Sequence, residues 1–124
     1  MYNKTVTVTT AELASGVVEI DTTMTKVTSS NKEGISSGTL YPREIQVINN
    51  CGVDLEWNML ANETEYNEYV DDSTNFGFIL LPSTDILQDE KRVNKCFKFL
   101  VRPISGETAT DDLRIDFISY NGGA

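Results

Sequence analysis

The sequence predicts an all-β fold, an antiparallel β-sandwich of about seven strands, immunoglobulin-like or jelly-roll-like, with at most one short helix. Short segments along the chain alternate apolar and polar residues with a period of two, which is typical of half-buried strands. Threonine, which is β-branched and favours extended backbone, occurs 14 times and is concentrated in the first 28 residues. The sequence lacks the regular alternation of strands with helices that would indicate a parallel sheet.

The N-terminal third is expected to contain two strands and a loop. In Lys4–Thr10 the side chains of Val6 and Val8 share one face, and a second strand is expected from Val17 to about Thr28. The first ten residues form either an edge strand of this domain or an arm that extends onto another subunit. Ser29–Thr39 is rich in serine and glycine and is expected to be an exposed loop that makes contacts.

The middle of the chain predicts a β-hairpin. Two alternating segments, Glu44–Asn49 and Val53–Met59, flank Asn49–Gly52, whose Asn and Gly residues tolerate positive φ. The apolar residues of the second segment share one face and are expected in the core: Val53, Leu55, Trp57 and Met59. The polar residues between them are expected on the wet face: Asp54, Glu56 and Asn58.

The remaining elements follow from apolar segments and the breaks between them. Residues 61–75 carry five acidic side chains and no basic one, and they are expected to form a mobile loop. A strand is expected at Phe76–Leu81, a short helix at Asp85–Arg92, and a final hairpin formed by Cys96–Arg102 and Asp112–Tyr120.

Composition restricts the possible functions. The 124 residues suit a single domain, 1–124, and they carry a net charge of −9 and no histidine. The commonest general base and zinc ligand are therefore missing, and no nucleophile–base pair, phosphate loop or metal-ligand spacing is present, so we expect neither an enzyme nor a cofactor. Negative charge disfavours nucleic acid and anionic membranes as partners. No signal-peptide pattern is present, so we expect synthesis in a reducing cytoplasm.

Three features carry alternative interpretations. Cys51 and Cys96 are 45 positions apart and read as free thiols, or as a disulfide if the fold brings them together. The acidic segment 61–75 reads as a solvated loop, although its carboxylates are also calcium ligands by type. Tyr66 and Tyr69 stand in that acidic segment and are expected to lack apolar company, and exposed tyrosine is typical of protein and glycan interfaces.

Two parts of the chain, Tyr41–Trp57 and Phe78–Thr84, resemble small virion proteins of tailed bacteriophages. The resemblance lies in the pattern x-x-I-x-V-x-N-x-S/C-G-V-D-L followed by an apolar strand and a turn that contains proline. It extends loosely through Val93–Arg102 to the last strand, about two thirds of the chain. It implies a β-sandwich that decorates the capsid, builds head fibres or completes the head–tail joint, usually as a trimer or ring.

We therefore predict a non-enzymatic virion protein, a capsid decoration or head–tail accessory protein that oligomerises and docks on the major capsid or other virion proteins. The alternative is a carbohydrate- or receptor-binding module that uses the acidic loop, with or without calcium. The residues predicted to make contacts are Val6, Val8, Tyr41, Tyr66 and Tyr69. No catalytic, metal or cofactor residue is predicted.

Overall fold

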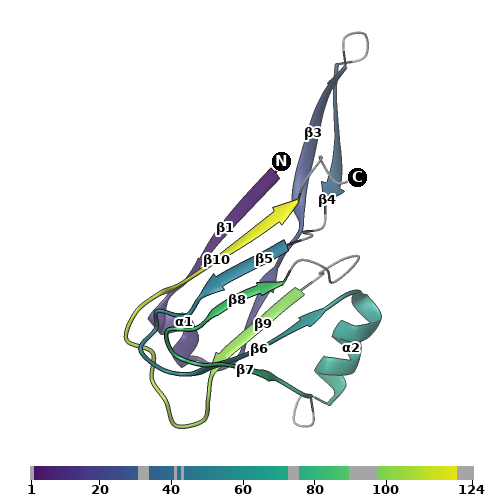
Figure 1. Cartoon of the computed structure of the whole chain (residues 1–124). Coiled ribbons are helices and arrows are strands. Elements are labelled where there is room, and N and C mark those ends of the chain that lie inside the picture. Colours follow the sequence, from purple (N-terminus) through teal and green to yellow (C-terminus); the bar gives the residue numbers. More distant parts are fainter. Residues whose placement is uncertain are drawn as a thin grey trace.

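The computed structural model describes residues 2–30, 34–40, 42, 44–72, 76–89 and 98–119, and it confirms the all-β prediction (Figure 1). These residues form ten strands and two short helices, one helix more than expected. In chain order the elements are β1 (Tyr2–Val8), α1 (Thr10–Ala14), β2 (Val18–Asp21), β3 (Met24–Ser30), β4 (Gly34–Leu40), β5 (Glu44–Ile48), β6 (Leu55–Leu60), α2 (Glu63–Asp71), β7 (Ile79–Leu81), β8 (Ile86–Asp89), β9 (Lys98–Pro103) and β10 (Leu113–Ser119).

Eight of the strands form two antiparallel four-stranded sheets. The first sheet has the order β1-β10-β5-β8 and the second has the order β2-β9-β6-β7. The connections β1–β2, β5–β6, β7–β8 and β9–β10 each cross from one sheet to the other. Two facing four-stranded sheets with these crossings make a jelly roll, so the strand order selects the second of the two predicted sandwich types.

The strands β3 and β4 form a separate two-stranded ribbon, inserted between β2 and β5. Its register runs from Met24 opposite Leu40 to Ser30 opposite Gly34. Figure 1 shows the ribbon projecting from one end of the sandwich. The prediction of a loop at Ser29–Thr39 is therefore wrong for its described residues, because cross-strand pairing overrides the low strand propensity of glycine there.

The core lies between the two sheets and follows the predicted alternation. Leu55 and Trp57 are buried, and Val53 and Met59 pack against the same core. The Trp57 ring stacks on Phe99 at 5.7 Å between centroids, and Phe99 meets Phe117 of the opposite sheet edge to face at 6.1 Å. Aromatic contacts thus connect the two sheets at the centre of the domain.

The two hairpins predicted within the sandwich, the one around Asn49–Gly52 and the final one, do not form, so both predictions are wrong. β5 pairs with β10 and β8, whereas β6 pairs with β9 and β7 in the other sheet. β9 and β10 likewise belong to different sheets. Alternation shows which side chains face the core, but an arch that crosses between sheets and a hairpin that stays in one sheet give the same alternation.

The arch between β5 and β6 is held by Asn49, whose side chain is completely buried. Its Nδ2 donates to the carbonyl oxygens of Val53 at 2.9 Å and Leu81 at 3.0 Å, and its Oδ1 accepts from the Cys51 N–H at 3.1 Å. Its own N–H donates to the carbonyl of Asp85, and its carbonyl accepts from the Thr84 N–H, both at 2.9 Å. One residue therefore ties the β5–β6 arch to the β7–β8 connection.

A positive φ and a tight contact with a side chain require glycine at position 52, at the same end of the sandwich. Gly52 has a φ of 83°, and a Cβ there would lie 2.5 Å from the Thr110 hydroxyl oxygen. Thr110 in turn donates its N–H at 2.8 Å and its hydroxyl at 3.1 Å to the Cys51 carbonyl. The loop before β10 thus packs directly on the arch.

The acidic segment is not a loop in its described part but the helix α2. The Asn62 side chain caps the helix by accepting from the Glu65 N–H at 2.9 Å, and acidic residues in the first turn favour the helix dipole. Tyr69 is buried against Leu60 and Leu100 on the outer face of the second sheet. These residues form a second, smaller core that includes part-buried Val17, Tyr66, Phe76 and Phe78.

Two further elements differ from the prediction. Residues 10–14 form α1, which opens with a capping box: the Thr9 side chain accepts from the Glu12 N–H and Glu12 accepts from the Thr9 N–H. The helix expected at Asp85–Arg92 is the strand β8 over Ile86–Asp89, and the rest of that segment lies outside the described residues. Pairing with β5 overrides local helix propensity there.

We predict that Asn49→Ala lowers the free energy of unfolding by about 3 kcal/mol, because it removes three side-chain hydrogen bonds, two of them buried and one part-buried. Urea denaturation measures the effect. The matched control is Asn50→Ala at the exposed next position, expected to change stability by less than about 0.5 kcal/mol. Equal effects of the two substitutions would contradict this account of the arch.

Candidate interaction surface

The outer face of the first sheet carries an ordered array of polar and apolar side chains. The register aligns Asp116, Gln46 and Gln88 in one row across β10, β5 and β8. The adjacent row consists of Arg114, Ile48 and Ile86. This face therefore presents a polar row beside one that ends in two exposed isoleucines.

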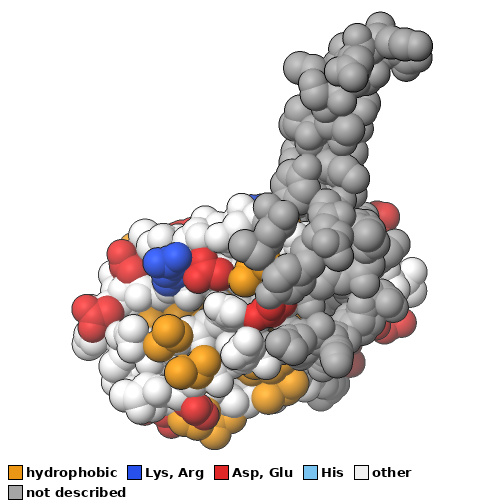
Figure 2. Space-filling view, turned by 45° about the horizontal axis from the view of Figure 1, so that its top comes forward, with side chains coloured by type: hydrophobic (Ala, Val, Ile, Leu, Met, Phe, Trp, Pro, Cys, Tyr) orange, Lys and Arg blue, Asp and Glu red, His pale blue; other side chains and the backbone are white. Residues whose placement is uncertain are grey.

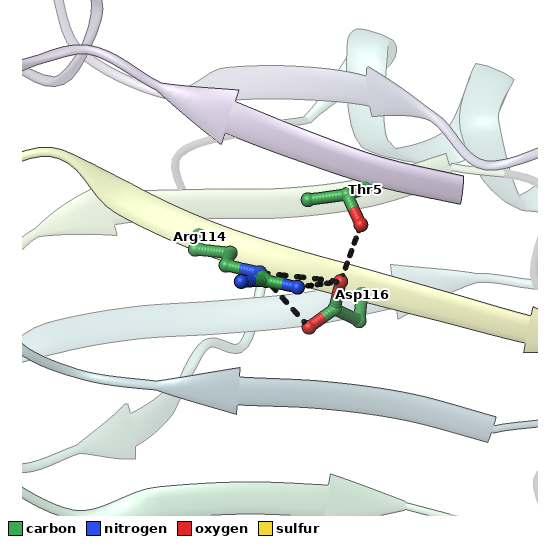
Figure 3. A network of polar contacts seen from close by, with 3 residues as sticks. All are labelled: Thr5, Arg114 and Asp116. Carbon is green, nitrogen blue, oxygen red and sulfur yellow. Dashed lines mark hydrogen bonds and ion pairs between the residues drawn. The ribbon is translucent and has the colours of Figure 1, made fainter. Parts of the chain in front are cut away.

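An exposed polar network fixes the β10 end of this surface (Figure 3). The Thr5 hydroxyl of β1 donates to Asp116 Oδ1 at 2.6 Å, and Arg114 Nε lies 3.2 Å from Asp116 Oδ2. The Arg114 side chain is 70% exposed, so the ion pair contributes at most about 1 kcal/mol to stability. Its main effect is to balance charge and to orient the guanidinium along the sheet.

The glutamines of the polar row are held by a buried carboxylate. Glu44 is 3% exposed, and its Oε2 accepts from the side-chain amide of Gln46 at 2.5 Å and of Gln88 at 3.0 Å. These contacts restrict both amides to one orientation before any partner binds. Ordered amides reduce the entropy lost on binding a polar partner.

An open hollow of about 490 Å³ lies over this face. The side chains that line it are Gln46, Ile48, Asn50, Ile86, Gln88, Asp112, Arg114 and Asp116. Figure 2 shows a face on which basic and acidic groups lie side by side with hydrophobic side chains next to them. These side chains can bind another protein surface, since their amides, carboxylates and guanidinium form hydrogen bonds and their two isoleucines make apolar contacts.

The contact residues predicted from sequence have other roles in the fold where they are described. Val8 is buried and Val6 packs against the main core, so β1 is an edge strand of its own sheet, the first of the two predicted alternatives. Tyr69 is buried in the second core, and Tyr66 packs beside it at 6.3 Å between ring centroids. Tyr41 lies outside the described residues.

Tyr66 attaches α2 to the second sheet. Its hydroxyl donates to the Glu19 carboxylate of β2 at 2.7 Å, and this hydrogen bond, with the carboxylate charge, raises the pKa of the tyrosine. Burial, followed by the charge of Glu19, raises the pKa of Tyr69. The expectation that the two tyrosines lack apolar neighbours is therefore wrong, because Phe76 and Phe78 fold back against them.

Sequence reasoning missed the outward isoleucines, although a signal was present. Val47-Ile48 and Ile86-Leu87 are adjacent apolar pairs in strands. Neighbouring side chains in a strand point to opposite faces, so one member of each pair must point outward. In the structure Val47 is buried and Leu87 packs against the core, while Ile48 and Ile86 face solvent.

Comparison with known proteins gives no relative. No family model matches the chain, and no curated protein or solved structure shows significant similarity to it. Among the described residues, no cluster of three or more Asp, Glu, Cys or His side chains has the geometry to hold a metal ion. Neither of the two described helices is long and apolar enough to cross a membrane.

The thiol of Cys51 is free and buried in the main core beside Asn49. Burial, reinforced by the carboxylates of Asp111 and Asp112, raises the pKa of Cys51 to about 11. The thiol therefore stays protonated at neutral pH and is a structural group rather than a nucleophile. Its predicted partner in the alternative disulfide, Cys96, lies outside the described residues.

We predict that Cys51 in a Cys96→Ser background reacts with iodoacetamide at pH 8 roughly 100-fold more slowly in the folded protein than in urea. The unfolded thiol ionises at its ordinary pKa, so the free energy of unfolding falls as pH rises towards about 11. Mass spectrometry of the alkylated chain measures the rate. Equal alkylation rates with and without urea would show that the thiol is accessible.

Proposed function

We propose that the chain is a non-enzymatic structural protein of a bacteriophage virion, a capsid decoration or head–tail accessory protein, which docks on the shell through the β3–β4 ribbon. The observation that carries the proposal is this ribbon. Among the described residues it pairs with no third strand, and it projects from the sandwich (Figure 1). A projecting ribbon offers two strand edges to another chain.

The composition of the ribbon supports a docking role. A two-stranded hairpin is marginally stable in water unless it packs against further structure. Only four of its 14 strand residues are apolar: Met24, Val27, Ile35 and Leu40. So little apolar surface gives the ribbon little stability of its own, and contact with a shell would supply the rest.

The fold is compatible with this role. Jelly rolls are common in viral capsid and lectin domains, although a fold by itself does not determine function. The resemblance of Tyr41–Trp57 and Phe78–Thr84 to phage virion proteins favours the capsid side. A chain with a net charge of −9 also suits the solvent-facing surface of a shell better than contact with packaged DNA.

The alternative, a glycan- or receptor-binding module built on residues 61–75, is not favoured. It required exposed tyrosines in an acidic loop. The described part of that segment is the helix α2, and Tyr69 is buried on the outer face of the second sheet. Within its described residues, 61–72, no further observation points to a sugar or to calcium.

The test is a chain with a shortened ribbon. Thr25 and Thr39 are opposite each other, so joining them by Asn-Gly in place of residues 26–38 keeps the register and closes a two-residue turn. We predict that the purified wild-type chain co-sediments with virions of the source phage. The shortened chain should lose co-sedimentation while its melting temperature stays within a few degrees of wild type.

The control is Glu107→Ala, an exposed change in the β9–β10 loop that leaves the ribbon intact, and it should co-sediment as wild type does. If the shortened chain co-sediments fully, the ribbon is not the docking element. If antibodies to the chain fail to label intact virions and the wild-type chain does not co-sediment, the virion assignment itself is wrong.

A further inference from the structure

The hollow over the outer face of the first sheet has an apolar strip between two polar borders. Ile48 and Ile86 lie opposite each other in the β5–β8 register and are 51% and 61% exposed. The polar side chains that border this pair are Gln46, Gln88 and Asp116 on one side and Asn50 and Asp112 on the other. A ligand in the hollow therefore meets apolar contact in the middle and hydrogen-bonding groups on both sides.

The two glutamine amides are held by a group that does not itself line the hollow. Gln46 and Gln88 each donate one N–H to the carboxylate of Glu44, which is only 3% exposed. A primary amide has two N–H donors and a carbonyl acceptor. The bond to Glu44 thus leaves one donor and one acceptor on each amide for a ligand, already oriented.

The two carboxylates are likewise fixed from outside the hollow. The Thr5 hydroxyl donates to Asp116 Oδ1 at 2.6 Å, and the Thr10 N–H donates to Asp112 Oδ1 at 3.0 Å. Neither threonine lines the hollow. Polar groups held in this way lose little freedom when a ligand binds, which favours binding by hydrogen bonds.

The charges of the hollow select a neutral ligand. Asp112, Arg114 and Asp116 are two residues apart along the chain, and all three line the hollow. Two carboxylates repel an anion, while the guanidinium between them repels a cation. Within the described part of the chain, no group of three or more metal-ligating side chains occurs here or elsewhere.

We propose that this hollow binds a neutral saccharide of one or two pyranose rings. The faces of a pyranose ring present C–H groups that suit the isoleucine pair. Its hydroxyls lie around the rim, and each donates one hydrogen bond and accepts two. Carboxylates accept from such hydroxyls, and the glutamine amides both donate and accept, so both borders match the rim of the ring.

The dimensions fit a ligand of this size. The hollow measures about 490 Å³, within the range of roughly 300–1,000 Å³ typical of small-molecule sites. Three neighbouring strands span about 10 Å, and borders four residues apart along a strand are about 13 Å apart. A protein partner typically needs a larger patch, roughly 800 Å² on each side, so a small polar ligand fits this hollow better.

The expected affinity is low. The hollow is open, and no aromatic ring lies among its lining side chains to stack on a sugar. We therefore expect a dissociation constant on the order of 1 mM for a single site. The inference goes beyond the virion proposal and does not depend on the ribbon, and its site is separate from residues 61–75.

The first test is a glycan array that carries neutral, sialylated and sulphated glycans. The full chain is coupled in many copies to fluorescent beads, so that avidity compensates for the low affinity of each site. We expect the beads to bind neutral glycans and not the anionic ones. The best neutral glycan is then titrated into the isotope-labelled free chain, where NMR should show saturable shifts of the Gln46 and Gln88 side-chain amides.

Two variants test the site itself. Gln88→Ala removes one oriented amide and Ile86→Ala removes half of the apolar strip, and each should weaken binding roughly 3- to 10-fold. Both positions are exposed, so the melting temperature should stay that of wild type. The matched control is Leu80→Ala, 55% exposed and opposite Glu56 in the second sheet, which should bind as wild type does.

Three results would overturn the inference. The first is a wild-type chain that binds no neutral glycan on the array or binds only anionic ones. The second is a set of NMR shifts that lies away from the first sheet, for example on α2. The third is binding that survives Gln88→Ala and Ile86→Ala together. The chain with the shortened ribbon should bind glycan as wild type does, so this inference and the virion proposal fail separately.

Discussion

The architecture depends on satisfying the polar backbone where the chain crosses between sheets. A crossing arch leaves ladder hydrogen bonds behind, and each buried group without a partner costs free energy. Asn49 provides partners for such groups through five hydrogen bonds, which join the β5–β6 arch to the β7–β8 connection. In that connection Thr84 adopts a φ of 69°, a conformation that a non-glycine residue holds only when its surroundings fix it. Asn49 therefore ties the connection between β7 and β8 to the arch.

The sequence predicts burial better than pairing. Alternation at Leu55, Trp57 and Met59 correctly identifies the core face, and Val6 and Val8 follow the same rule. The segment Asn49–Gly52 has the composition of a hairpin turn, yet it forms an arch, because the choice between them depends on long-range contacts such as that of Asn49 with Leu81. Local chemistry specifies a reversal of the chain, whereas the rest of the fold decides which sheet receives the next strand.

The candidate surface could likewise be predicted only in part from the sequence, because the rest depends on the tertiary fold. The acidic residues of 61–75 led to the prediction of a loop where α2 forms. A helix signal was nevertheless present, because Asn62 followed by Glu65 is typical of a helix start and Tyr66 and Tyr69 are spaced to share one helix face. The exposed isoleucines are detectable as adjacent apolar pairs, but only the strand order places Ile86 at an edge. The candidate surface therefore depends on tertiary arrangement, because side chains from the three strands β10, β5 and β8 line the hollow.

The most direct test of this account is native-state hydrogen exchange at the arch. Loop amides usually exchange through local opening, far below the global free energy of unfolding. The amides of Asn49, Cys51 and Thr84 each take part in the Asn49 network. The account predicts that they exchange only through global unfolding, with the same denaturant dependence as the amide of Phe99 in central strand β9. Exchange of these three amides at a clearly lower free energy than Phe99 would show that the arch opens by itself, and that the fold does not depend on it.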